Sequence, residues 1–276
     1  MKKGTLTNIL LTFMLIIGLS LLLYPSFSDY WNSMHQTRAI ARYAEEVAHL
    51  KQEDYSKLWE EAIAYNKSLL GRTNSYVLDE TQKESYRSLL SISEASPMGY
   101  IEIPSINVNL PIYHSTDEDV LQVAVGHLEW TSLPTGGEST HTALSGHRGL
   151  PSARLFTDLD QVREGDTFIL NILDRVMTYE VDQILIVEPH VTEPLFIEEG
   201  KDLCTLVTCT PYGVNSHRLL VRGHRVDNAE QVRTYRITAD ALRVEPLLVA
   251  IILFVPILLI LLIFMMIYDR TNSKKH

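Results

Sequence analysis

Two uncharged apolar runs lie near the ends of this 276-residue chain and confine the water-soluble fold to the stretch between them. Residues 247–268 carry no charged side chain. Because a helix needs about 20 apolar residues to cross the hydrocarbon layer, they predict a transmembrane helix. Residues 9–24 form a shorter run after Lys2 and Lys3, as expected of a signal peptide or of an uncleaved membrane anchor. Residues 25–31 lack a clear small-x-small cleavage pattern, so we favour the anchor.

Basic residues outside the two runs predict the orientation. Lys2 and Lys3 precede the first run, and Arg270, Lys274 and Lys275 follow the second. The positive-inside rule therefore places both tails in the cytoplasm at the cell membrane and everything between the runs outside the cytoplasm. The formal net charge of -10 leaves no basic stripe for phosphates, which argues against a nucleic-acid partner.

The middle of the chain divides by composition. Residues 33–70 are rich in Ala, Glu, Lys and Leu with apolar positions at helical spacing, which predicts a pair of amphipathic helices. We expect an interruption near residues 52–54 and an end at Gly71. Residues 71–98 are rich in Ser, Thr, Asn and Glu, so we expect a surface segment laid over or beside the main domain.

From residue 100 onward the pattern changes to short β-rich runs separated by turn residues. This strand density, with helical connections near residues 118–125 and 152–159, predicts a closed or nearly closed β-barrel. The predicted strands are 100–103, 106–113, 142–145, 167–173, 176–187, 203–210 and 217–226. The predicted organisation is a tail and anchor or signal (1–30), N-terminal helices with a possible lid-like segment (31–98), the barrel (99–230), a linker (231–246), the transmembrane helix (247–268) and a tail (269–276).

The two cysteines lie on one predicted strand, residues 202–210. Cys204 and Cys209 are five positions apart, an odd number, so their side chains point to opposite faces of the strand. Five strand steps put their Cα atoms roughly 16 Å apart, beyond the reach of a disulfide at about 7 Å. We expect Cys204 to be a small buried hydrophobe and Cys209 to be a free thiol.

Three residues in separate segments carry the chemistry. Cys209 ends a strand where a side chain emerges at a loop-lined rim, and His147 is preceded by Gly146 at a second strand end. Arg218 offers a permanent charge with its donors in a fork, and its neighbour His217 faces the opposite side of the strand. Together they suggest acyl transfer through a thioester. The alternatives are a core cysteine and structural histidines.

Metal binding has little support in the sequence. The histidines and acids do not fall into a zinc-ligand spacing. The acidic residues 117–119 are more simply the first turn of a helix, where the helix dipole favours negative charge. We expect no metal and no other cofactor.

Two segments resemble a known family. Residues 205–209 (TLVTC) resemble the TLxTC signature of the sortases, and residues 210–225 look like the class C, pilus-assembling branch. Residues 147–160 are similar to the same branch around its catalytic histidine. The resemblance spans roughly residues 99–225.

The resemblance implies a fold, an activity and partners. The fold is the eight-stranded sortase β-barrel, with Cys209 as nucleophile, His147 as acid and base, and Arg218 as ligand of the oxyanion and substrate. The signature also makes Leu206 and Thr208 candidate substrate-binding residues. The implied activity is cleavage of an LPxTG-like sorting signal between Thr and Gly through a thioacyl intermediate, which a lysine of another pilin resolves into an isopeptide bond. The partners are therefore pilin subunits and the membrane.

One segment departs from the class C pattern. Class C enzymes commonly carry a lid marked by an Asp-Pro-aromatic motif just before the barrel. Here residues 77–82 read VLDETQ, with no proline or aromatic residue after Asp79. We therefore do not expect a lid anchored in the usual way.

Three other functions stay open at this point. A housekeeping sortase would anchor surface proteins to a cell-wall precursor. An L,D-transpeptidase uses the same residue types, but its histidine-glycine-cysteine context does not match residues 207–210. A non-catalytic membrane assembly scaffold would use the barrel only to bind, and would neither form an adduct at Cys209 nor cleave a peptide.

Overall fold

The computed structural model describes residues 3–70, 78–93 and 96–228. The predicted linker, second transmembrane helix and C-terminal tail lie outside the described residues. Residues 28–228 form one compact unit. Its strands are β1 (Gly99–Ile103), β2 (Val108–His114), β3 (Val125–His127), β4 (Thr140–Ser145), β5 (Thr167–Ile172), β6 (Arg175–Val187), β7 (Asp202–Thr210) and β8 (His217–Val226).

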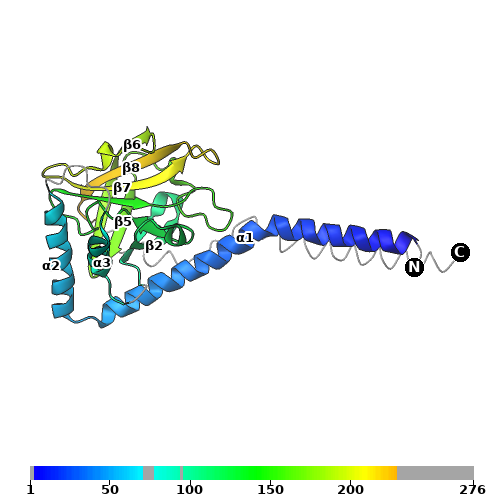
Figure 1. Cartoon of the computed structure of the whole chain (residues 1–276), viewed down its shortest axis with the longest axis horizontal. Helices are drawn as coiled ribbons and strands as arrows, with labels where there is room; N and C mark the ends of the chain where they lie inside the picture. Colours follow the sequence, from blue (N-terminus) through cyan, green and yellow to red (C-terminus); the bar gives the residue numbers. More distant parts are fainter. Residues whose placement is uncertain (1–2, 71–77, 94–95, 229–276) are drawn as a thin grey trace. The chain divides into compact units, whose positions relative to one another are not determined.

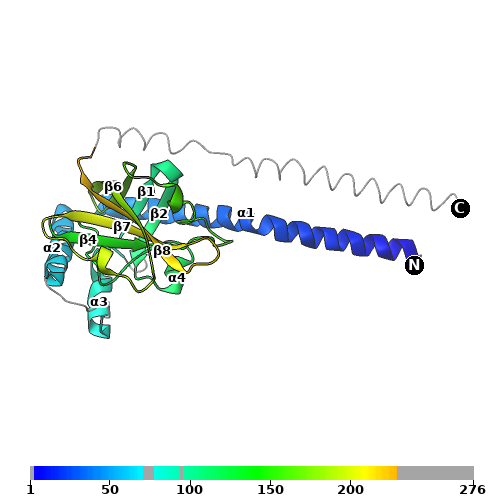
Figure 2. The ribbon, with the colours of Figure 1, turned by 90° about the horizontal axis from the view of Figure 1, so that it is seen from above.

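These eight strands close into a barrel in the order β1-β2-β3-β4-β7-β8-β6-β5. Neighbouring strands run antiparallel except for the pairs β2/β3 and β4/β7, which are parallel. Figure 2 shows β4, β7 and β8 side by side on one wall. The predicted eight-stranded barrel is thus confirmed.

Two connections differ from the expectation. Residues 118–125 were expected to be helical, but the helix α4 covers only Glu118–Leu121 and the stretch ends in the short strand β3. Residues 152–159 were also expected to be helical, but they form turns that lead into a 3₁₀ helix at Leu159–Gln161. The first helix is cut short because Val125 pairs with Ile112 of β2.

The barrel interior is filled by alternate residues of each strand. On β7, Cys204 and Leu206 are fully buried in the main core. Phe168 of β5 and Tyr179 of β6 stack there with ring centroids 5.5 Å apart. Gly223 of β8 leaves room for them, since a Cβ atom at this position would lie 2.8 Å from the Phe168 ring. The core therefore has no space for an added methyl group at this point.

Two helical stretches before the barrel, residues 28–49 and 52–69, pack on its outside (Figure 1). The helix α1 covers Lys3–His49 and α2 covers Gln52–Leu69, so the chain breaks two residues earlier than the sequence suggested. The buried Tyr43 hydroxyl donates to the carbonyl of Met98 at 2.9 Å and accepts from the amide of Leu173 at 2.7 Å. The side chain of Asn66 donates a hydrogen bond to the carbonyl of Leu133 and accepts one from its amide. The predicted amphipathic helices are confirmed, and hydrogen bonds fix them to the barrel.

The segment without the lid motif forms a helix of its own. Asp79 accepts a hydrogen bond from the amide of Gln82 at 2.8 Å, and the Gln82 side chain accepts one from the amide of Asp79 at 2.9 Å. This capping box begins α3 (Glu80–Ser88). The segment lies against the barrel as expected, but it is more than a surface segment, because Tyr86 and Leu90 are fully buried.

The first apolar run lies within α1. Among the described helices, α1 is the one that is long and apolar enough to cross a membrane, with a mean hydropathy of 1.8 over its most apolar window. None of that window is buried within the protein. By length and composition, α1 can anchor the protein to a membrane.

Candidate active site

The strand order brings three of the predicted residues to one end of the barrel. In the parallel β4/β7 pair, Ser145 lies opposite Val207. His147 therefore follows two residues later, just past the end of β4, and Cys209 follows two residues later on β7. In the antiparallel β7/β8 pair, Cys209 lies directly opposite Arg218. A thiol, an imidazole and a guanidinium thus leave three neighbouring strands at the same edge.

Gly146 fixes the turn that carries His147. Its amide donates to the carbonyl of Val207 at 3.1 Å, and its carbonyl accepts from the Thr208 hydroxyl at 2.7 Å. A Cβ atom on Gly146 would lie 2.7 Å from the ring of Phe156, whose own amide donates to the carbonyl of His147 at 3.1 Å. Only glycine fits between β7 and this ring, which explains the residue that precedes His147.

Alternation along β7 separates the predicted residues into two sets. Cys209 is half-buried and shares a face with Val207, whereas Leu206 and Thr208 face the other way. Leu206 is 0% exposed and Thr208 is 2% exposed. Neither side chain offers surface to a bound peptide, so the expectation that they bind substrate finds no support in this arrangement. Thr208 instead holds Gly146.

Cys204 differs from Cys209 in accessibility and ionisation. It is fully buried, and burial raises the pKa of its thiol well above the usual value, with a further contribution from the charge of Asp202. Both cysteines are free thiols. The prediction that Cys204 is buried is confirmed, and Cys209 is the accessible thiol.

Arg218 is half-buried, and the structure leaves part of its fork available. One terminal nitrogen donates to the carbonyls of Asn215 and His217 at 3.3 and 3.1 Å. Within the described ranges no carboxylate pairs with Arg218. Its other donors can therefore bind a carbonyl oxygen or an oxyanion next to Cys209.

The imidazole of His147 faces an acidic residue of α4. Its Nε2 atom lies 3.8 Å from the carboxylate of Glu118, which is beyond hydrogen-bond distance. The side chain of Glu118 is 75% exposed and that of His147 27% exposed. Water screens this pair, so we expect Glu118 to contribute little to binding or stability.

An apolar surface adjoins the thiol on the same face of the sheet. Val207 of β7 and Leu220 of β8 are buried in a second cluster outside the main core, and each is two residues from Cys209 or Arg218. We call this set the outer apolar cluster; its buried members are Ala143, Leu195, Val207 and Leu220, with Leu128, Trp130, Leu185 and Val187 packed against them. The partly exposed members, Leu128, Trp130, Leu185 and Val187, are the part of this cluster that an extended peptide can contact.

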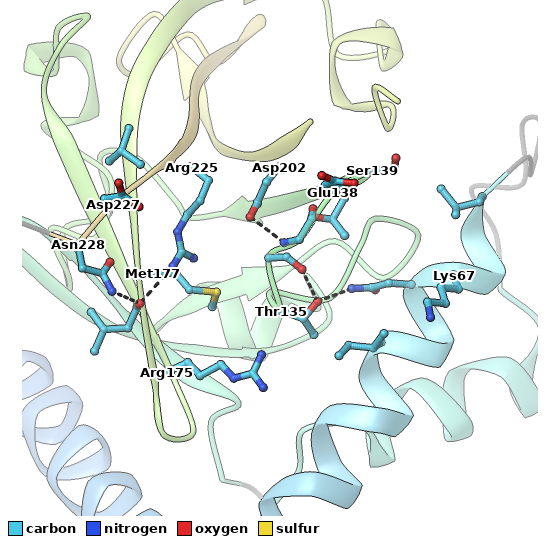
Figure 3. A pocket seen from close by; sticks show the side chains of 18 residues that line it. Lys67, Thr135, Glu138, Ser139, Arg175, Met177, Asp202, Arg225, Asp227 and Asn228 are labelled. Atoms are coloured by element: carbon cyan, nitrogen blue, oxygen red, sulfur yellow. Dashed lines mark hydrogen bonds between the residues drawn. The ribbon is translucent and has the colours of Figure 1, made fainter. Parts of the chain in front are cut away.

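A large cavity lies at the opposite end of the barrel (Figure 3). It measures about 1250 Å³, and it is lined by the first residues of β4 and β7, the end of β8 and helix α2. Asp202 at its wall is seven strand steps from Cys209, or roughly 23 Å. The carboxylate of Asp202 already accepts hydrogen bonds from Tyr179 and from the amide of Gly137, as Figure 3 shows for the latter. This cavity is therefore separate from the thiol chemistry.

Comparison with known proteins agrees with this arrangement. Residues 101–226 match the sortase domain model. The crystal structure of sortase C1 from Streptococcus agalactiae aligns with a TM-score of 0.68 and 52% identity, over 70% of this chain and 100% of that chain. The chain belongs to the sortase family.

Two other relatives are similar to this sortase. Sortase C of Streptococcus pneumoniae, whose structure addresses catalysis and pilin substrate specificity, aligns with a TM-score of 0.63 and 44% identity over 69% of this chain and 97% of that chain. Sortase D of Bacillus subtilis (strain 168) is 33% identical over 131 residues, which are 46% of this chain and 63% of that protein. The structural neighbours are class C sortases, in agreement with the resemblance noted in the sequence.

Proposed function

We propose that this sortase is a membrane-anchored cysteine transpeptidase that cleaves an LPxTG-like sorting signal and joins pilin subunits through lysine isopeptide bonds. The observation that carries this proposal is the placement of Cys209, His147 and Arg218 at the ends of three adjacent strands. The outer apolar cluster beside them supports it, because burying one leucine side chain contributes about 1.5 to 3 kcal/mol. The class C neighbours support pilins as the substrates.

The first half of the reaction forms a thioester. The sulfur of Cys209 attacks the carbonyl carbon of the signal threonine, and the negative charge that develops on the oxygen is stabilised by the Arg218 fork. His147 gives a proton to the departing glycine amine as the peptide bond breaks. The threonine acyl group is then bound to Cys209.

The second half transfers the acyl group to a lysine. His147, now neutral, accepts a proton from the lysine ammonium group of a second pilin. The neutral amine attacks the thioester carbon, the Cys209 thiolate leaves, and the nitrogen loses its second proton to water as the isopeptide bond forms. The glycine amine released in the first half takes up one proton from water, so atoms and charges balance over the two halves.

The proposal is tested with the full chain in detergent and an LPxTG-type peptide. Wild type should form a thioester adduct and release the glycine fragment, whereas Cys209→Ala should do neither while keeping the melting temperature of wild type. An adduct or turnover in Cys209→Ala would refute the nucleophile. Absence of both in wild type would favour a binding scaffold. A cell-wall amine accepted in preference to a pilin lysine would point to a housekeeping role.

We also propose that the barrel lies outside the cytoplasm, anchored by α1. Cys209 is half-buried but accessible, whereas Cys204 is fully buried, so a thiol reagent reports on one site. A membrane-impermeant maleimide added to intact cells should label wild type and leave Cys209→Ala unlabelled. Labelling that requires cell lysis would contradict this orientation.

A further inference from the structure

The residue after His147 is a buried arginine. The side chain of Arg148 is 8% exposed, and its guanidinium forms an ion pair with Asp160. Its Nη1 atom donates to the Thr210 hydroxyl at 3.3 Å. In the part of the chain that the structure describes, Nε of Arg148 is the one buried side-chain nitrogen or oxygen without a hydrogen-bond partner. A charged group is thus held out of water with incomplete compensation.

An aromatic ring covers the same turn. The guanidinium carbon of Arg148 lies 5.9 Å from the ring centroid of Tyr212, which belongs to the loop between β7 and β8. Gly149 has a φ of +77°, and a Cβ atom there would lie 2.9 Å from the Tyr212 ring. A larger residue at position 149 would therefore push the ring away. We call Arg148, Asp160, Thr210 and Tyr212 the Arg148 clamp.

The register of β4 and β7 shows what the clamp connects. The last paired residues of this ladder are Ser145 and Val207, so His147 and Cys209 lie beyond its end. Before His147 and Cys209, the Thr208 hydroxyl donates a hydrogen bond to the carbonyl of Gly146. After them, Arg148 donates a hydrogen bond to the hydroxyl of Thr210. The two reactive residues are bracketed by a contact before them and a contact after them.

The energetic cost of burying Arg148 suggests that it orients nearby groups rather than stabilising the fold. Burying an ion pair costs several kcal/mol per ion, and well-packed apolar residues often stabilise a protein as well or better. A guanidinium, however, can bond a carboxylate and a hydroxyl at once through its fixed fork. An error of about 1 Å between reacting groups can cost roughly 100-fold in rate.

We propose that Arg148 is a positioning residue, which holds the Cys209 end of β7 in register with His147 through Thr210 and Tyr212. This inference rests on the proposed transpeptidase function for its rate readout. It does not require Arg148 to touch the substrate. The expected signature of its loss is a lower kcat with an unchanged KM, because no residue of the clamp belongs to the outer apolar cluster, which we propose contacts the peptide.

The test uses the full chain in detergent with Arg148→Met, Arg148→Lys and Tyr212→Ala. The matched control is Arg154→Met, since Arg154 pairs with Asp158 at 2.7 Å in the same loop but with 59% of its side chain exposed. Arg148→Met should lower kcat for LPxTG-type peptide cleavage about tenfold or more and leave KM within about twofold. The kcat of Arg148→Lys should lie between those of wild type and Arg148→Met, because lysine keeps the charge but loses the fork. The control variant Arg154→Met should match wild type in both kcat and KM.

A second readout does not depend on the peptide. The rate of Cys209 alkylation by iodoacetamide is measured against pH, with Cys209→Ala as the blank, because the neighbouring imidazole influences this reaction. The profile of Arg148→Met should move toward that of His147→Ala, and the profile of Arg154→Met should match wild type. This arm reports on the clamp even if the wild-type chain cleaves no sorting signal, in which case only the proposed function fails.

A double-mutant cycle separates positioning from general stability. Tyr212 is 61% exposed, so Tyr212→Ala should fold normally and still lower kcat about threefold or more. The double variant should lose no more than Arg148→Met alone, because both residues act through one loop. Wild-type kcat and alkylation profile in Tyr212→Ala, or in a folded Arg148→Met, would overturn the proposal. So would losses that multiply in the double variant.

Discussion

Acidification should destabilise the barrel, in part through the buried side chain of His127. His127 of β3 is fully buried, with its Nδ1 atom 2.8 Å from the Tyr86 hydroxyl and its Nε2 atom 2.9 Å from the carbonyl of Ser132. A carbonyl only accepts, so Nε2 carries the proton and Nδ1 accepts from Tyr86. The imidazole is therefore held in its neutral form.

The size of the effect follows from the ionisation of this group. Burial lowers the pKa of His127 from 6.5 to about 4. The unfolded chain takes up a proton first as the pH falls, so the stabilisation is fully present above about pH 6.5 and is lost between 6.5 and 4. Going from about pH 7.5 to about pH 5 should remove about 2 kcal/mol of unfolding free energy through this residue.

The assay is urea unfolding in mild detergent, followed by tryptophan fluorescence at several pH values. His127→Gln removes the group that titrates. We expect the variant to be less stable than wild type at neutral pH. Between about pH 7.5 and about pH 5, its unfolding free energy should fall by about 2 kcal/mol less than that of wild type. Burial also lowers the pKa of His114 and the pKa of His141. The unfolding free energy of His127→Gln should therefore still fall to some extent as the pH is lowered. Parallel curves for wild type and His127→Gln would refute the reasoning.

Three further substitutions test the site and the core. Arg218→Lys keeps the charge but loses the fork, so thioester formation in a single-turnover assay should slow at least about tenfold, and an unchanged rate would remove Arg218 from the mechanism. Tyr43→Phe leaves the carbonyl of Met98 and the amide of Leu173 without their partner, and urea unfolding should show a loss of about 1 to 3 kcal/mol. Gly223→Ala places a methyl group against Phe168 and should also cost about 1 to 3 kcal/mol, so wild-type stability would contradict the tight packing described there.

Local sequence pattern predicted some elements well and others not at all. The strand 202–210 coincides with β7, because its β-branched and aliphatic residues alternate between two buried faces. The three residues of β3 carry no such signal, and they become a strand only because β2 and β4 offer partners on both sides. The helix α3 could have been predicted, since Asp79 followed by Gln82 is a capping pattern. Tyr86 is its only large apolar residue, which gives no visible periodicity.

The candidate site shows the same division. Cys209, His147 and Arg218 could be singled out from their local context, and the strand order explains why they gather at one edge. The inward direction of Leu206 and Thr208 follows from alternation alone. The role proposed for Arg148 has no local signal, because its partners Asp160, Thr210 and Tyr212 are 12 to 64 residues away along the chain. Such contacts appear only when the loops are folded.

The parallel pairing of β4 with β7 has a consequence for how substrate choice can change. Parallel neighbours need a long crossover, and here that crossover contains β5, β6 and all the loops between them. Insertions in the loop between β6 and β7, which carries Leu195 of the outer apolar cluster, would reshape the wall beside the thiol while the ends of β4 and β7 stay in register. Peptide recognition can thus change in a part of the crossover that holds none of the residues of the Arg148 clamp.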